Sequence, residues 1–129
     1  MDPEILEDPF VKVVTGLVIG LILGSFTTML SYRVPRNLSI VSPPSQCPHC
    51  HTPLTKRDLI PVLSWLKEKG HCRHCQASIG VRYLIIELIT TFAVTIAFVS
   101  FGFEPELIVA LLAIIAFITL VTINLEKQR

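Results

Sequence analysis

Three long stretches with at most one charged residue constrain this 129-residue chain more than any other feature. They cover residues 13–32, 83–103 and 107–125, and only the second contains a charge, Glu87. A helix needs about 20 residues to cross the ~30 Å hydrocarbon core of a bilayer. The remaining residues are too few to build a soluble shell around three apolar helices, and only 16% of the chain is charged. The sequence therefore predicts an all-α membrane protein with three transmembrane helices.

Charge is divided unevenly between the segments that these stretches separate. Residues 1–12 carry a net charge of −3, residues 33–82 carry +6 and the turn at residues 104–106 carries −2. Lys and Arg gather on the cytoplasmic side of a membrane. We therefore expect the N-terminus and the turn to lie outside, and the long loop and the tail at residues 126–129 to lie inside.

The first stretch has glycine at every fourth position, at Gly16, Gly20 and Gly24. This spacing places them on one helix face, where a second helix could approach closely. The alternative is that they reflect only the general frequency of glycine in membrane helices. Threonines in the three stretches are expected to bond back to carbonyls one turn earlier; they are Thr27, Thr28, Thr90, Thr91, Thr95, Thr119 and Thr122.

The 33–82 loop contains an internal repeat with an offset of 25 residues. Residues 47–54 read Cys-Pro-His-Cys-His-Thr-Pro-Leu, and residues 72–79 read Cys-Arg-His-Cys-Gln-Ala-Ser-Ile. Each unit is typical of a knuckle, a tight turn that presents two thiolates to one ion. Together they supply four cysteines in a C-x2-C-x21-C-x2-C pattern, a set that suits tetrahedral zinc: Cys47, Cys50, Cys72 and Cys75.

Two alternatives to a four-cysteine zinc site exist. Two disulfides are possible from spacing, but a loop inside the reducing cytoplasm disfavours them. A histidine could replace a thiolate ligand, and the candidates are His49, His51, His71 and His74. Between the knuckles, residues 61–70 predict a short helix that begins at Pro61 and stops at Gly70. Its apolar side, which includes Trp65, would either pack on the zinc unit or dock at the membrane surface.

An ordered set of motifs runs from the first helix to the second. The set comprises Gly24-Ser25-Phe26, Arg33-x-Pro35, Cys47-Pro-x-Cys50, Ile60-Pro61-x-x-Ser64-Trp65, Gly70-x-Cys72-Arg73-x-Cys75 and Ile79-x-x-Arg82-Tyr83-x-x-x-Glu87. It resembles the N-terminal part of the bacterial type IV prepilin peptidases, bifunctional leader peptidases and N-methyltransferases of the inner membrane. The resemblance runs from about Gly16 to the last residue.

The resemblance implies an intramembrane aspartic protease in the inner membrane, with a periplasmic N-terminus and a cytoplasmic zinc loop. Such enzymes cleave the leaders of prepilins and pseudopilins, the latter in type II secretion, and methylate the new N-terminus with S-adenosylmethionine. Asn124 stands where the family has its first catalytic Asp, and an amide cannot take a proton from water. The family's second Asp, in a Gly-x-Gly-Asp motif, has no counterpart in these 129 residues. We therefore expect no peptidase activity from the chain alone, and a separate C-terminal catalytic half is a candidate partner.

Glu87 is an acid within an apolar stretch, and such residues are functional candidates. It would either pair with Arg82 or Arg33, or contact the cationic N-terminus of a pilin substrate. The alternative function for the whole chain is a membrane-tethered zinc-binding module that binds a partner without catalysis. Nucleic acid is not an expected partner, because the positive charges are spread over the 33–82 loop and follow from the orientation rule.

Overall fold

The computed structural model describes residues 2–58, 60 and 62–128 of the chain. Its helices are α1 (Pro3–Glu7), α2 (Pro9–Arg33), the 3-10 turn η1 (Val34–Arg36), α3 (Leu63–Lys67), α4 (Val81–Phe101) and α5 (Pro105–Lys127). The described residues contain no strand, only two isolated bridges. Three helices are long and apolar enough to cross a membrane. The predicted all-α membrane fold is confirmed.

The ends of the long helices follow from local chemistry. Helix α2 begins four residues before the predicted stretch, because Pro9 suits a first turn and the Asp8 carboxylate caps it. Asp8 accepts a hydrogen bond of 2.8 Å from the Phe10 N–H. Helix α4 ends at Phe101, before the predicted residue 103, because Gly102 takes a left-handed φ of 63°. Pro105 then starts α5.

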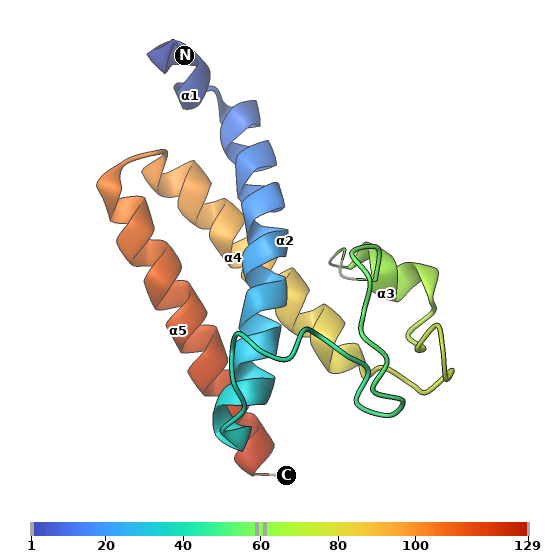
Figure 1. Ribbon diagram of the computed structural model, residues 1–129. Helices are drawn as coiled ribbons and strands as arrows, with labels where there is room; N and C mark the ends of the chain where they lie inside the picture. The colour runs from blue at the N-terminus through green and yellow to red at the C-terminus, as the bar shows by residue number, and fades with distance from the viewer. Residues whose placement is uncertain (1, 59, 61, 129) are drawn as a thin grey trace.

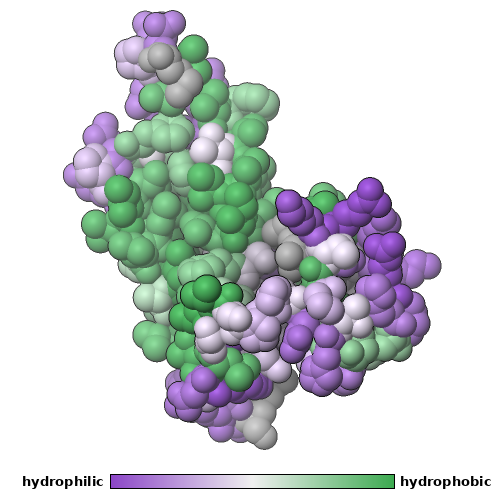
Figure 2. Space-filling model, in the orientation of Figure 1, coloured by the Kyte–Doolittle hydropathy of each residue, from purple (hydrophilic) through white to green (hydrophobic). Residues whose placement is uncertain are grey.

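Figure 1 shows α2, α4 and α5 as three long helices, with α4 crossing α2 and turning back into α5. Helix α3 and the segments around it form a separate lobe beside the start of α4. In Figure 2 the three long helices carry a mostly hydrophobic surface, and the lobe is mostly hydrophilic. We call the end of the bundle where α2 and α5 end and α4 begins the loop end.

The contact between α2 and α4 is a close approach of two backbones. A Cβ atom on Gly16 would lie 2.8 Å from Thr95 Cα, and one on Gly20 would lie 2.8 Å from Thr91 Cα. On Gly24 it would lie 2.9 Å from the Glu87 carbonyl oxygen. Any side chain at these positions would collide with backbone. The packing interpretation of the three glycines is therefore confirmed.

Most threonine hydroxyls of the three long helices are paired within their own helix. Thr27, Thr28, Thr90, Thr91, Thr95 and Thr122 each donate to the carbonyl four residues earlier, over 2.6–2.9 Å. The prediction is wrong only for Thr119, whose buried hydroxyl has no partner within the described part of the chain. These intrahelical bonds let polar side chains lie between apolar helices, because each hydroxyl is satisfied by its own helix.

Helix α5 packs on the α2–α4 pair chiefly near the turn that joins it to α4. A buried cluster there contains Val94, Ala97, Phe98 and Leu107. Phe98 also meets Phe103 of the turn edge to face, with ring centroids 5.6 Å apart. Farther along α5 only Thr119 is buried. The outer face of α5 is apolar and exposed, as expected of a surface that contacts lipid.

We expect Gly20→Ala to destabilise the bundle by about 1–3 kcal/mol, the usual cost of overpacking, because the new methyl group meets the Thr91 backbone. Gly80→Ala is the matched control, because a Cβ there meets only Arg82 N, at 4.0 Å. Both variants are compared by unfolding in mixed detergent micelles, followed by circular dichroism. Equal stability of Gly20→Ala and the unmodified chain would contradict the close approach.

Candidate metal centre and adjoining cleft

The first cysteine pair lies in a tight turn closed by backbone hydrogen bonds. The Cys47 N–H donates to the Thr52 carbonyl over 3.2 Å, and the His51 N–H donates to the Cys47 carbonyl over 2.9 Å. His51 takes a left-handed φ of 55° to make the turn. An isolated antiparallel bridge between Gln46 and Pro53 closes its base.

The second cysteine pair repeats this geometry 25 residues later. The Cys72 N–H donates to the Ala77 carbonyl over 2.8 Å, and the Gln76 N–H donates to the Cys72 carbonyl over 2.9 Å. Gln76 has a φ of 60°, and a bridge joins His71 to Ser78. The internal repeat read in the sequence is therefore a repeat of structure. We call the two turns, residues 46–53 and 71–78, knuckle 1 and knuckle 2.

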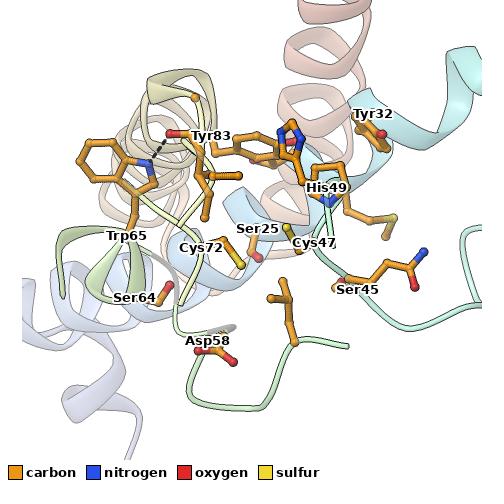
Figure 3. Close-up of a pocket in the computed structure, with 18 of the residues that line it drawn as sticks. Ser25, Tyr32, Ser45, Cys47, His49, Asp58, Ser64, Trp65, Cys72 and Tyr83 are labelled. Atoms are coloured by element: carbon orange, nitrogen blue, oxygen red, sulfur yellow. Dashed lines mark hydrogen bonds between the residues drawn. The ribbon is translucent and has the colours of Figure 1, made fainter. Parts of the chain in front are cut away.

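The two knuckles face one another and bring all four cysteine sulfurs together. The Cys47 and Cys75 sulfurs are 3.7 Å apart, those of Cys50 and Cys72 are 4.0 Å apart, and all four lie within 4.8 Å of one another. In Figure 3 the Cys47 and Cys72 side chains point toward each other. A tetrahedral zinc thiolate site with bonds near 2.3 Å has sulfurs about 3.8 Å apart.

These distances decide between the alternatives left by the sequence. A disulfide bond is about 2.05 Å long, and all four cysteines are free thiols. Among the described residues, the cluster suited to a metal ion contains only cysteines and no histidine. His71, for example, directs Nδ1 at the Lys69 carbonyl, 2.8 Å away. The donor set fits one tetrahedral metal ion held by four thiolates.

Local hydrogen bonds favour ionisation of two thiols of the cluster: backbone bonds from Cys75 and His74 lower the pKa of Cys72, and Thr52 lowers that of Cys50. Cys50 Sγ lies 3.2 Å from the Thr52 hydroxyl oxygen, and bonds from the side chain and backbone of Thr52 lower the pKa of Cys50 to about 6. A backbone bond from Ala77 lowers the pKa of Cys75, but burial and the neighbouring thiols outweigh it and raise this pKa to about 11. Four thiolates at these distances repel strongly, so a cation is needed for all of them to ionise.

The segment between the knuckles packs on knuckle 2. The predicted helix appears as α3, Leu63–Lys67, although its expected first residue, Pro61, lies outside the described residues. Trp65 Nε1 donates to the Ile79 carbonyl over 3.3 Å (Figure 3). The Trp65 ring covers Gly70, where a Cβ would lie only 2.8 Å from Cζ2. The packing interpretation is therefore confirmed for Trp65, whereas the Leu63 and Leu66 side chains are exposed.

Glu87 connects helix α4 to this segment. Its Oε2 accepts a hydrogen bond of 2.8 Å from the Val62 N–H. Val62 is a β-branched residue with a φ of 61°, a strained conformation that needs outside support. The Glu87 carboxylate supplies a fixed hydrogen-bond acceptor for that support.

The alternative expectation, that Glu87 pairs with Arg82 or Arg33, is wrong. Arg82 pairs instead with Glu126, with Nε and Oε1 2.6 Å apart. Arg33 donates hydrogen bonds to the carbonyls of residues 39 and 43, over 2.7 and 2.8 Å. These bonds hold the start of the loop close to the end of α2. The sequence suggested this pairing because Glu87 lies about one turn from the expected membrane interface, within reach of nearby arginines. The Arg82 side chain reaches across to another helix instead.

A cleft of about 780 Å³ lies between the knuckles and the loop end of α2 and α4. Its wall includes Ser25 and Tyr32 of α2, Tyr83 of α4 and Trp65 of α3 (Figure 3). Glu87 of α4 also lines it. Ligand sites in proteins are typically clefts of about this size, mostly apolar with a few polar groups. The sequence did not reveal the cleft itself, although each of these residues except Tyr32 belongs to one of the motifs.

Comparison with known proteins decides what kind of chain carries this site. The family described as Bacterial Peptidase A24 N-terminal domain matches residues 18–101, which contain both knuckles and the cleft-lining residues of α2 and α4. The chain belongs to this family.

Curated relatives of this A24 chain are named as prepilin leader peptidase/N-methyltransferases. The Bacillus subtilis (strain 168) protein is 42% identical over 97 residues, covering 75% of this chain and 39% of the relative. The Myxococcus xanthus (strain DK1622) protein is 39% identical over 109 residues, covering 84% and 32%. The Dickeya chrysanthemi protein is 32% identical over 143 residues, covering 93% and 50%. The A24 chain thus spans half or less of each of these relatives, and no solved structure matches it.

Asn124 lies apart from the metal centre. It is an exposed residue near the end of α5, beyond the part of the chain that matches the family domain. It does not line the cleft within the described residues. The structure therefore brings the four cysteines together in the lobe, links Glu87 of α4 to that lobe through Val62, and places Asn124 on a different element at the loop end.

We expect the purified A24 chain to bind one metal ion, and Cys72→Ser to lose it, because three thiolates and a hydroxyl hold a tetrahedral ion poorly. His74→Ala is the matched control, because it removes a histidine between the two cysteines of knuckle 2 and leaves all four thiols. Elemental mass spectrometry of both variants gives the metal content per chain. Full metal content in Cys72→Ser, or its loss in His74→Ala, would overturn the ligand assignment.

Proposed function

We propose that this chain provides the metal-binding lobe and first membrane helices of a prepilin leader peptidase and N-methyltransferase that processes type IV pilins or type II secretion pseudopilins. The observation that carries the proposal is the cleft, which lies between the cysteine cluster and the ends of two membrane helices. A pilin leader joined to an apolar helix would need such a place, where a membrane-embedded segment meets a polar lobe. The names of the relatives support this substrate class.

Zinc is the metal we propose for the four cysteines. Four thiolates with no open coordination position are typical of structural zinc, which stabilises a small loop that could not fold alone. The lobe fits this description, because the described residues 46–80 contain only one short helix and two isolated bridges. The ion would hold knuckle 1 against knuckle 2 and thereby shape one wall of the cleft.

Glu87 is the residue we propose for contact with the cationic N-terminus of the processed substrate. Its carboxylate lines the cleft, and the Val62 N–H occupies Oε2 and fixes the orientation of the group. A carboxylate has about four lone-pair sites, so it can accept further donors while it holds this one. S-adenosylmethionine would supply the methyl group for the substrate amine, and the size of the cleft is compatible with a cofactor of that class.

The orientation we propose places the lobe in the cytoplasm and the α4–α5 turn in the periplasm of a bacterial inner membrane. The support is the charge distribution, +6 on residues 33–82 against −3 and −2 on the segments at the other end. The reducing cytoplasm also keeps free thiols available for a metal.

For this topology we expect Glu104→Cys to react with a membrane-impermeant maleimide in intact cells. Lys127→Cys is the matched variant at the opposite end of α5, and it should react only after the membrane is permeabilised. The unmodified chain measures the background from the four native cysteines. Labelling of Lys127→Cys in intact cells would show that the orientation is reversed.

Asn124 supports the second candidate, a membrane-tethered zinc module that binds a partner without catalysis. By the family resemblance it stands at the position of the first catalytic Asp, and aspartic catalysis needs two carboxyl groups with separated pKa values. An amide neither accepts nor donates the required proton. We therefore propose that peptidase activity requires both an acid at position 124 and a C-terminal half that carries the second Asp.

We expect no leader cleavage by the unmodified 129-residue chain in membranes, measured as a gel shift of a prepilin with a basic leader. Asn124→Asp alone should also be inactive, because a lone carboxylate activates water but leaves the departing amine without its acid. Activity should appear when Asn124→Asp is combined with the C-terminal half of a relative that carries the Gly-x-Gly-Asp motif.

The control for this experiment is the same C-terminal half supplied to the chain with Asn124 retained, which should be inactive. Cleavage by that combination would mean that another residue acts as the first acid. No cleavage by the Asn124→Asp combination, with both parts present in the membrane and metal bound, would favour the non-catalytic module.

A further inference from the structure

Arg82 joins three membrane helices at the loop end. Its Nη2 donates to the Ser31 hydroxyl of α2 over 3.0 Å, and its Nε lies 2.6 Å from Oε1 of Glu126 on α5. Ser31 is fully buried, and the side chains of Arg82 and Glu126 are each 28% exposed. We call these three residues the Arg82 node.

The node lies at the end of α5, where that helix is only partly buried. Figure 1 shows α4 and α5 diverging from their shared turn toward the loop end. The apolar cluster that holds α5 is near the turn, around Leu107, and Thr119 is the only other buried residue of α5. In the last turns of α5 the side chains of Thr122, Ile123 and Glu126 are half-buried, and the contact between Arg82 and Glu126 adds a charged interaction to this partial packing.

Both charged residues of the node stand at helix ends that do not favour them. Arg82 is in the first turn of α4, where the helix dipole is positive, and Glu126 is in the last turn of α5, where it is negative. Each charge alone would be unfavourable at its helix end. Their attraction across a partly desolvated contact opposes both penalties.

Arginine suits this position better than lysine. The guanidinium group donates a hydrogen bond from Nη2 to Ser31, while its Nε lies close to the Glu126 carboxylate without making a hydrogen bond to it. A lysine ammonium also has several donors, but they all sit on one nitrogen, whereas the guanidinium places separate nitrogens beside Ser31 and Glu126. The contact with Ser31 is a directional hydrogen bond, and the contact with Glu126 is electrostatic.

We infer that Arg82 is a positioning residue, which holds the last turns of α5, and position 124 with them, against the loop ends of α2 and α4. Asn124 precedes Glu126 by two residues on the same helix, so a shift of one moves the other. The importance of position 124 for catalysis rests on the proposed function. The inference that Arg82 holds the end of α5 in place is independent of that function.

Charge reversal separates this inference from a simple dipole effect. The dipole alone predicts that Arg82→Glu and Glu126→Arg each stabilise their helices. The node predicts that each single reversal places like charges together and loosens α5, and that the double reversal restores it. Amide hydrogen exchange of residues 117–127, measured on the full chain in nanodiscs, should rise about fivefold or more in each single variant.

Two controls make the outcome decisive. Lys127→Gln removes a neighbouring charge outside the node and should leave exchange unchanged. Glu126→Gln, a near-isosteric change, should raise exchange while the metal content of the lobe stays at one ion per chain, which shows that the fold persists. Unchanged exchange in Glu126→Gln, or a double reversal no better than the single ones, would overturn the inference.

Discussion

The close approach of α2 and α4 at three glycines is the constraint on which the rest of the structure depends. Gly24 brings the end of α2 against the backbone of Glu87, so that the glycine contact also sets where α4 leaves the bundle. The cleft then forms between these two helix ends and the lobe. A side chain at any of the three positions would separate the helices. The wall of the cleft and the reach of Arg82 to Ser31 would be lost with that separation.

The lobe is stabilised differently from the α2–α4 pair, because it contains little regular secondary structure. Its two knuckles are held by a few backbone hydrogen bonds, by Trp65 on Gly70 and by the Glu87 contact with Val62. These are modest interactions for a segment of this length. A metal ion on four thiolates would contribute the remaining stability.

The metal centre could be predicted from sequence because its signal is local. Cys47 and Cys50 belong to one turn and Cys72 and Cys75 to a copy of it, so that only the meeting of the two turns is a tertiary event. The partner of Glu87 could not be predicted in this way. The place of Glu87 near the membrane interface suggested an ion pair with Arg82 or Arg33, but the hydrogen-bond donor is the backbone of Val62, 25 residues earlier in the chain. A backbone N–H carries no sequence signal.

The sequence by itself determined the three membrane helices, the glycine face of the first and the cysteine repeat, because hydrophobic length, helical periodicity and ligand spacing are properties of contiguous segments. Only the tertiary structure decided which helix the glycines contact, where Arg82 and Glu87 find their partners, and that the lobe and two helix ends enclose a cleft. Those features depend on the crossing of α2 and α4 and on side chains that reach between elements. Such contacts join residues 25 to 51 positions apart, and no short-range pattern records them.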